Sequence, residues 1–198
     1  KMHYKIFDNF QNISGILRFK STEKYGFLTN AFLNRSEITY YDDSIIGNVS
    51  NIAGGAFRNC ANLQWLKFYG TSIGPVSGIN AVRDCPNLTL TDMPNVITFG
   101  HGYWGRNCPK LRSISLPNVT KITTGATFYG DGNSLKDFYM PKLIQCGPTT
   151  GNDSIFYSIY AGGTITVNSA LQTADNGAAD GDLVYAANSR GATIVYVS

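Results

Sequence analysis

Apolar residues recur along this chain at a fixed phase, with a period of about 24 residues, a length known from several classes of repeat protein. Three segments align directly, "CANLQWLKF" from Cys60, "CPNLTLTDMP" from Cys85 and "CPKLRSISLP" from Cys108, and "GNSLKDFYMP" from Gly132 keeps the pattern with glycine at the cysteine position. The leading leucines of the four copies are almost evenly spaced, at Leu63, Leu88, Leu111 and Leu135. A repeat of this kind is typical of a solenoid, in which each coil buries its apolar side against the neighbouring coils.

Each copy contains a short alternation that predicts a β-strand. Leu66 and Phe68 alternate with polar or aromatic residues in the first copy, and the third and fourth copies do the same at Ile114 and Leu116 and at Phe138 and Met140. Such a period of two places alternate side chains on one face, so stacked copies would form a parallel sheet. The second copy is imperfect, because it has Thr91 at an apolar position. The residues expected in the core are Phe57, Cys60, Leu63, Leu66, Cys85, Leu88, Cys108, Leu111, Ile114, Leu116, Phe128, Leu135 and Phe138.

The pattern extends weakly in both directions. "ISGILRF" around Leu17, "SEITYYDD" around Ile38 and "AGGTITV" around Ile165 predict further strands. The C-terminal residues differ and predict a short helix, an Asp-rich turn, a second helix and the closing strand "ATIVYV". A solenoid needs such an atypical unit to cover its last coil.

The second of these helices has both capping signals. Asp180 or Asp182 stands where an N-cap is expected, and Gly191 stands where a left-handed residue ends a helix.

The runs "IAGGAFRNCANLQWLKF" and "CPKLRSISLPNVTKI" resemble the BspA-like leucine-rich repeat family, whose pattern is Ile-Gly-x-x-Ala-Phe-x-x-Cys-x-x-Leu-x-x-Ile-x-Leu-Pro. The match is good over residues 45–147. It departs from the pattern at Trp104-Gly105, which replaces the Ala-Phe pair, and at the insert "GTSIGPVSGIN". The resemblance implies a right-handed leucine-rich-repeat coil. The leucine spacing predicts about 23–25 residues per turn, and the C-terminal segment predicts a small α/β cap. It also implies a protein of a bacterial or protist surface, or of a phage particle, that binds rather than catalyses.

The expected organisation is one continuous domain. Residues 1–44 form degenerate N-terminal coils, 45–163 the repeat solenoid and 164–198 the capping unit. The last unit resembles the endings of repeat proteins encoded by Bacteroidetes phages and their hosts. We expect residue 198 to lie near a natural C-terminus, and Lys1, which is not Met, leads us to expect residues upstream.

Composition narrows the classes of partner. Charged residues make up only 15% of the chain, and Gly, Asn, Ser and Thr supply the polarity, which favours strands and turns over solvated helices. The net charge is +3 without a run of Lys or Arg, so we expect no nucleic-acid partner. No apolar stretch approaches the roughly 18 residues of a membrane span, so we expect no membrane insertion.

The stretch "GHGYWG", Gly100 to Gly105, is a literal dinucleotide-binding motif. A cofactor loop would need a helix starting at its last glycine, but "RNCPKL" follows. The aligned corners "AGGAF" and "TTGATF" are also rich in small residues, so the glycines are interpreted as a corner of the coil. We therefore expect no cofactor.

Other candidate chemistry is weak. Cys60, Cys85 and Cys108 share one repeat phase, which is typical of small buried hydrophobes but leaves a disulfide between neighbouring coils open. The cysteines are not spaced for zinc, and only His3 and His101 could serve in a catalytic triad.

Acidic residues offer two further weak candidates. Asp92 and Asp137 are a conceivable acid pair for glycoside cleavage, and "DNGAADGD" is a sparse candidate for calcium. Solvated strand-face acids and helix capping explain both more simply, so we expect no catalytic residue and no metal.

Outward aromatic residues are the best functional lead. If Leu66 and Phe68 face inward, the alternating residues Trp65, Lys67 and Tyr69 face outward. Tyr139 has the same phase in the fourth copy and is also expected to face outward. Exposed rings on a rigid face suit sugar stacking or a protein interface. The candidate binding residues are Trp65, Lys67, Tyr69, Tyr103, Trp104 and Tyr139, although Trp104 could instead replace a core Phe. We expect an adhesion module that recognises a glycan or a protein surface. One alternative is a structural domain of a phage fibre or particle, which would form a homo-oligomer or larger assembly. A carbohydrate-active enzyme is a remote alternative.

Overall fold

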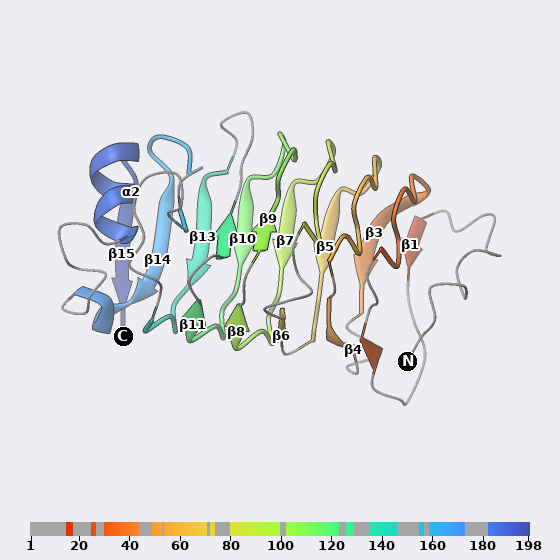
Figure 1. Ribbon diagram of the computed structural model, residues 1–198. Coiled ribbons are helices and arrows are strands. Elements are labelled where there is room, and N and C mark those ends of the chain that lie inside the picture. The colour runs from red at the N-terminus through yellow and green to blue at the C-terminus, as the bar shows by residue number, and fades with distance from the viewer. Residues whose placement is uncertain are drawn as a thin grey trace.

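The chain folds into an elongated solenoid of stacked parallel strands (Figure 1). The computed structural model describes residues 15–17, 25–26, 30–43, 49–52, 54–70, 72–73, 80–99, 102–122, 126–128, 135–145, 155–156, 159–172 and 182–198. Every strand pair among them is parallel, because each coil returns the chain to the same side before the next strand begins. The predicted fold class, a repeat coil with a parallel sheet of short strands and a small α/β cap, is confirmed.

The largest sheet has eight strands in the order β1-β3-β5-β7-β10-β13-β14-β15. These are β1 (Gly15–Leu17), β3 (Ile38–Asp42), β5 (Trp65–Lys67), β7 (Leu90–Asp92), β10 (Ser113–Ser115), β13 (Asp137–Met140), β14 (Thr164–Asn168) and β15 (Thr193–Val197). The strands expected in the degenerate coils around Leu17, Ile38 and Ile165 are therefore present as β1, β3 and β14.

Two smaller sheets complete the coils (Figure 1). One has the order β11-β8-β6-β4-β2, with β2 (Tyr25–Gly26), β4 (Val49–Asn51), β6 (Ser72–Ile73), β8 (Thr98–Phe99) and β11 (Lys121–Ile122). The other pairs β9 (Gly102–Trp104) with β12 (Ala126–Phe128). The strands are short because the chain must turn several times within each repeat.

One hydrophobic core runs between these sheets from Ala31 to Ala192. Every residue expected in the core from the repeat phase is at most 1% exposed. Aromatic rings contact one another along it: Phe32 and Phe57 are stacked with centroids 4.9 Å apart, and Phe99 and Phe128 are tilted by 47° with centroids 4.8 Å apart. Such aromatic pairs contribute about 0.5–1.5 kcal/mol beyond the area that they bury.

The cysteines at the shared repeat phase are free thiols rather than disulfides. The Cys60 thiol donates to the Phe32 carbonyl at 3.2 Å, and the Cys85 thiol donates to the Phe57 carbonyl at 3.0 Å. Burial raises the pKa of the Cys60 thiol. Cysteine is thus small enough for this corner, and its thiol also offers a weak donor to a backbone carbonyl of the preceding coil.

The position just before each cysteine adopts a left-handed backbone. Asn59, Asp84 and Asn107 have φ values of 59°, 57° and 55°, and Asn34 has 61° in the preceding coil. Asn and Asp tolerate this conformation better than other residues with a side chain. The Asn59 amide also donates to Asn34 Oδ1 at 2.8 Å, so the corner is fixed by both backbone and side-chain chemistry.

The described parts of the C-terminal unit follow the predicted order, and the Asp-rich turn before Asp182 lies outside the described residues. A 3₁₀ helix, η2 (Ser169–Gln172), and α2 (Asp182–Arg190) precede β15, and α2 lies at the end of the solenoid in Figure 1. Gly191 has φ 63° and donates to the Ala187 carbonyl at 3.0 Å, which is the expected left-handed C-cap. Asp182 is the first residue of α2, whereas Asp180 lies outside the described residues. The division of the chain at residues 44 and 163 stays a prediction.

Candidate functional site

The outward face of β3, β5 and β7 carries two rows of side chains in register. Tyr40, Trp65 and Leu90 form the first row, and Asp42, Lys67 and Asp92 form the second. Between them lies the inward row of Tyr41, Leu66 and Thr91, which is fully buried. Strand alternation therefore separates the core from a face on which large and charged groups lie close to one another. We call this surface the Trp65 face.

An aromatic pair forms the centre of the Trp65 face. The rings of Tyr40 and Trp65 have centroids 5.1 Å apart and planes inclined by 38°. The Tyr40 hydroxyl donates to Gln64 Oε1 at 2.8 Å, which fixes the orientation of both side chains. The pair therefore presents a partly exposed ring surface on a backbone held by strands on both sides.

A hollow of about 490 Å³ lies on the side of Trp65 where the strands begin. It is lined by Tyr40, Gln64, Trp65, Asn87, Thr89 and Lys110. The Lys110 ammonium donates to Asn87 Oδ1 at 2.7 Å, and the Asn87 amide donates to the Ala61 carbonyl at 3.0 Å. Thr89 Oγ1 donates to the Gln64 carbonyl at 2.9 Å. We call this depression the amide hollow.

A second hollow of about 290 Å³ lies on the other side of the same indole. Its lining consists of Asp42, Trp65, Leu66, Lys67, Leu90 and Asp92. Lys67 Nζ lies 3.9 Å from Asp92 Oδ2 and 5.3 Å from the centroid of the Tyr69 ring. Leu90 is 37% exposed and gives this depression, which we call the acidic hollow, an apolar floor.

Lys67 stays cationic in this setting. Its hydrogen bond with the Tyr69 side chain and the nearby carboxylates of Asp92 and Asp42 raise its pKa from the ordinary value. A cation over a ring and beside a carboxylate is attracted by both, although exposure to solvent weakens each attraction. The group is therefore a fixed positive charge beside two acids.

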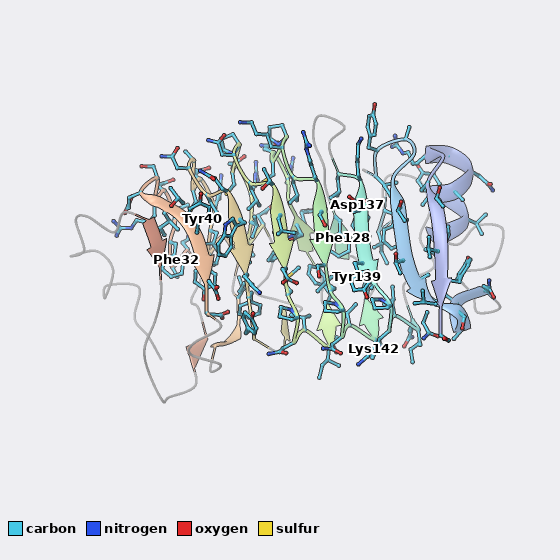
Figure 2. The ribbon with its side chains drawn as sticks, turned by 180° about the vertical axis from the view of Figure 1, so that it is seen from behind. Phe32, Tyr40, Phe128, Asp137, Tyr139 and Lys142 are labelled. Atoms are coloured by element: carbon cyan, nitrogen blue, oxygen red, sulfur yellow. The ribbon has the colours of Figure 1, made fainter. Side chains whose placement is uncertain are left out.

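The structure brings together only some of the residues expected to bind a partner. Trp65, Lys67 and Tyr69 lie in one coil, and all three are partly buried. Tyr139 is 49% exposed and shares the row of Lys67 and Asp92, but it lies on β13, three strands away from β5. At about 4.8 Å per strand this is about 14 Å. Figure 2 shows the wide separation of Tyr40 and Tyr139 along the solenoid.

Tyr103 belongs to a different surface. It lies on β9, in the two-stranded sheet with β12, and is 39% exposed. The Arg106 guanidinium lies 5.9 Å from its ring centroid. Tyr103 therefore does not join Trp65 in one site.

The prediction that Trp104 contacts a partner is wrong. Its side chain is 1% exposed and packs edge-on against Phe99, with ring centroids 5.7 Å apart. Trp104 pairs in register with Phe128 of the next coil, so it takes the place of the core phenylalanine. Its indole Nε1 donates to Thr91 Oγ1 at 3.2 Å, and this bond explains the hydroxyl of the imperfect second copy.

The described part of "GHGYWG", which begins at Gly102, is a strand followed by a turn. Residues 102–104 form β9, Gly105 has φ 82°, and the chain then turns toward β10 without starting a helix. Helix N-terminal N–H groups, which hold the pyrophosphate in a dinucleotide site, are not available at this glycine. His101 lies outside the described residues.

The conceivable acid pair is not brought together. Asp137 shares the row of Leu90 on β13, whereas Asp92 is on β7, two strands away and in the other outward row. Asp92 is also paired with Lys67. His3, Cys146 and Asp175 lie outside the described residues.

The described residues contain neither a cluster of metal ligands nor a membrane-spanning helix. Within that part of the chain, no group of three or more His, Cys, Asp or Glu side chains is placed to hold a metal ion. None of the described helices is long and apolar enough to cross a bilayer.

Sequence reasoning missed Tyr40 and Gln64. The signal was present, because Tyr40, Trp65 and Leu90 are evenly spaced along the chain and therefore share one phase. The neighbouring Tyr41 obscured it, because two adjacent tyrosines do not reveal which one faces inward. Tyr41 is fully buried, and Tyr40 lies on the outer face.

The family model of the BspA type leucine rich repeat region matches residues 27–161 with six copies. No curated protein matches the chain, and no solved structure matches it. Repeats of this type are commonly binding or adhesion modules of surface proteins and are typically not enzymes. The match covers more than half of the chain and includes the coils that form the Trp65 face, and the chain therefore belongs to the BspA-type leucine-rich repeat family.

Proposed function

We propose that this chain is a non-enzymatic binding module of a cell-surface or virion protein, and that it recognises a carbohydrate through the Trp65 face. The site consists of the Tyr40–Trp65 pair and the hollow on either side of the indole. No cofactor or metal takes part in this proposal.

The observation that carries the proposal is the tilted contact of Tyr40 and Trp65 on a rigid sheet. The apolar face of a sugar ring can stack on an exposed aromatic ring, while its hydroxyl groups need nearby hydrogen-bonding partners. The Trp65 face supplies both, because amide, hydroxyl, ammonium and carboxylate groups surround the indole. A preformed platform also avoids much of the ordering cost of binding.

A protein partner fits this surface less well. The centre of a protein interface is usually depleted of charged residues and needs a large contact area. Here Asp42, Lys67 and Asp92 lie next to the aromatic pair. Among the described residues that line the two hollows, Leu90 of the acidic hollow is the one large aliphatic side chain that is more than a third exposed. Small hollows with polar walls favour a small ring over a flat protein surface.

A glycan array with the purified chain tests the proposal. We expect the wild type to bind a defined set of glycans and Trp65→Ala to lose at least about tenfold in affinity, since truncating a Trp at the centre of a binding surface costs about 2 kcal/mol or more and tenfold corresponds to about 1.4 kcal/mol. Tyr139→Ala is the matched control, because it removes an exposed ring from the same sheet face outside both hollows. The proposal is contradicted if no glycan binds or if Trp65→Ala binds as well as the wild type.

A structural role in a fibre or particle is the second candidate. The exposed ring of Tyr139, far from the Trp65 face, favours a contact with a sister chain. Sedimentation velocity separates the two roles. A stable trimer or larger assembly that Tyr139→Ala dissociates would support the structural role, whereas a monomer that binds glycans would support recognition.

A further inference from the structure

We infer that the ligand of the Trp65 face is an acidic oligosaccharide, with a carboxylated sugar in the amide hollow and a neutral sugar in the acidic hollow. This inference rests on the proposed carbohydrate-binding function. It adds the chemical class of the ligand and the orientation of the oligosaccharide along the Trp65 face. It follows from the donors and acceptors that each hollow has left to offer.

The amide hollow presents hydrogen-bond donors from Gln64. Gln64 Oε1 already accepts the Tyr40 hydroxyl at 2.8 Å. The amide nitrogen at the other end of this side chain carries two N–H groups. Gln64 is exposed and lines the hollow, so these donors are accessible to a ligand.

Lys110 adds a charged donor to the same hollow. Its ammonium has three N–H groups and gives one to Asn87 Oδ1 at 2.7 Å. Asn87 is itself held on the Ala61 carbonyl at 3.0 Å, so the ammonium is positioned through a chain of two hydrogen bonds. Two N–H groups of Lys110 are then directed to a ligand or to solvent.

The described lining of the amide hollow contains no carboxylate. The carbonyl oxygens of both lining amides, Gln64 and Asn87, each accept a hydrogen bond already. A ligand group that is rich in acceptors and negatively charged therefore fits best, and a carboxylate has two such oxygens. The carboxylate of a uronic or sialic acid would place its charge beside Lys110 while its ring stacks on the aromatic pair.

The acidic hollow has the opposite character. Among the described residues, two carboxylates, Asp42 and Asp92, and one ammonium, Lys67, line it. The two carboxylates disfavour a carboxylate of the ligand in this hollow, whereas sugar hydroxyls can donate to Asp92. Exposed Leu90 offers an apolar floor for the ring. A neutral sugar is the complementary occupant.

Trp65 lines both hollows, so the two sugars are neighbours across one indole. The amide hollow lies toward the start of the strands and the acidic hollow toward their end, because their lining residues come from successive rows. The ligand therefore runs from the Lys110 end to the Asp92 end of the Trp65 face.

Titration calorimetry with paired glycans tests this inference. The probes are hexamers of hyaluronan, oligogalacturonate and alginate, each with a counterpart in which the carboxyl groups are reduced to alcohols, and sialyllactose paired with lactose. We expect the wild type to bind the acidic member of at least one pair about tenfold more tightly, because a hydrogen bond to a charged group is stronger than a neutral one. Hyaluronan alternates acidic and neutral sugars and is the expected best ligand.

Two variants that remove the same kind of contact identify the responsible charge. Lys110→Gln should lower affinity for the acidic glycan about tenfold and leave affinity for its reduced counterpart within about twofold. Lys142→Gln is the matched control, because Lys142 Nζ donates to Asn118 Oδ1 at the same 2.7 Å and lines neither hollow. Figure 2 shows Lys142 at the lower edge of the solenoid, far from Tyr40. The control should bind like the wild type.

The outcomes separate this inference from the function on which it rests. If Trp65→Ala abolishes binding but acidic and reduced glycans bind the wild type equally, the binding function stands and the acidic ligand is wrong. Equal effects of Lys110→Gln and Lys142→Gln, or binding of dextran sulfate as tight as that of the uronates, would show that charge alone is sensed and would also overturn the inference. If no glycan on the array or in these pairs binds, the proposed function itself fails.

Discussion

The indole Nε1 of Trp104 donates a hydrogen bond to Thr91 Oγ1 over 3.2 Å, and both side chains are at most 1% exposed. Thr91 occupies the inward row of Leu66 and Ile114, where other coils have apolar residues. Trp104 occupies the position of Phe128, where a phenylalanine would need no partner. The two departures from the repeat therefore satisfy each other's polar groups.

Replacing Thr91 with Val should destabilise the protein by about 1–3 kcal/mol, because the buried indole N–H is left without its acceptor. In a Trp104→Phe background the same Thr91→Val change should cost much less, since the donor is already absent. Urea unfolding of the four proteins of this double-mutant cycle measures the coupling.

Ile114→Val is the control for this cycle. It changes the neighbouring position of the same inward row and should cost about 0.5–1.5 kcal/mol in either background. The interpretation fails if Thr91→Val is as stable as the wild type, or if it costs the same with and without the indole.

The Trp104–Thr91 pair separates what the repeat pattern predicts from what it leaves open. The period of Leu63, Leu88 and Leu111 identifies the inward rows because each coil repeats the same environment. The repeat left two orientations of Trp104 open, a core position or an outward one, because its partner Thr91 lies on another side of the coil and has no counterpart in the other copies. A departure from a repeat has no period, so only the three-dimensional contact explains it.

The Trp65 face was likewise predicted in part. Alternation placed Trp65 and Lys67 outward, and the structure adds Tyr40 and the polar walls of the hollows. The walls come from Asn87 and Lys110, which lie outside the strands, in turns whose side-chain directions a period of two does not describe.

A buried carboxyl makes stability depend on pH. Asp43 is 1% exposed, accepts the Tyr69 backbone N–H at 2.6 Å and accepts the Tyr41 hydroxyl at 3.4 Å. Burial raises its pKa from 3.8 to about 6. The folded state therefore favours the protonated form, so this stabilising contribution is present below about pH 4 and is lost as the pH rises through 6.

Asp43→Asn should remove this loss. Each pKa unit corresponds to about 1.4 kcal/mol, so the variant should become more stable than the wild type by up to about 3 kcal/mol at pH 8, with the two converging near pH 4. Urea midpoints measured across that range test it. Asp42→Asn, at the partly exposed neighbour, should change stability by less than about 0.5 kcal/mol. A wild type that gains stability relative to Asp43→Asn on going from pH 4 to pH 8 would contradict the prediction.

The three buried thiols should be unreactive in the folded protein. Cys60, Cys85 and Cys108 are 0% exposed, and burial raises the pKa of Cys60. The thiolate is the reactive form, so both access and ionisation are suppressed. Iodoacetamide followed by peptide mass spectrometry should find these residues unmodified in buffer and alkylated in guanidinium. A peptide pair linked through Cys60 and Cys85 would refute the free-thiol state.

The left-handed corner before Cys60 should tolerate glycine better than alanine. Asn59 has φ 59° and donates to Asn34 Oδ1 at 2.8 Å. Asn59→Gly loses the hydrogen bond but keeps the backbone, whereas Asn59→Ala loses the bond and adds about 1 kcal/mol of strain. The midpoint of thermal unfolding should be highest for the wild type, lower for Asn59→Gly and lowest for Asn59→Ala. The opposite order of the two variants would mean that the corner is not held by backbone conformation.

The central claim is that the Trp65 face binds carbohydrate, and the chain's two tryptophans make it directly measurable. Trp65 lines both hollows, and Trp104 is buried with its N–H bound to Thr91. The measurement is a titration followed by ¹⁵N–¹H NMR of the two indole N–H signals, assigned with Trp65→Phe, using the glycan that binds best on the array. We predict that the Trp65 signal shifts progressively to saturation while the Trp104 signal stays unchanged. Binding that leaves the Trp65 signal unmoved would contradict the claim.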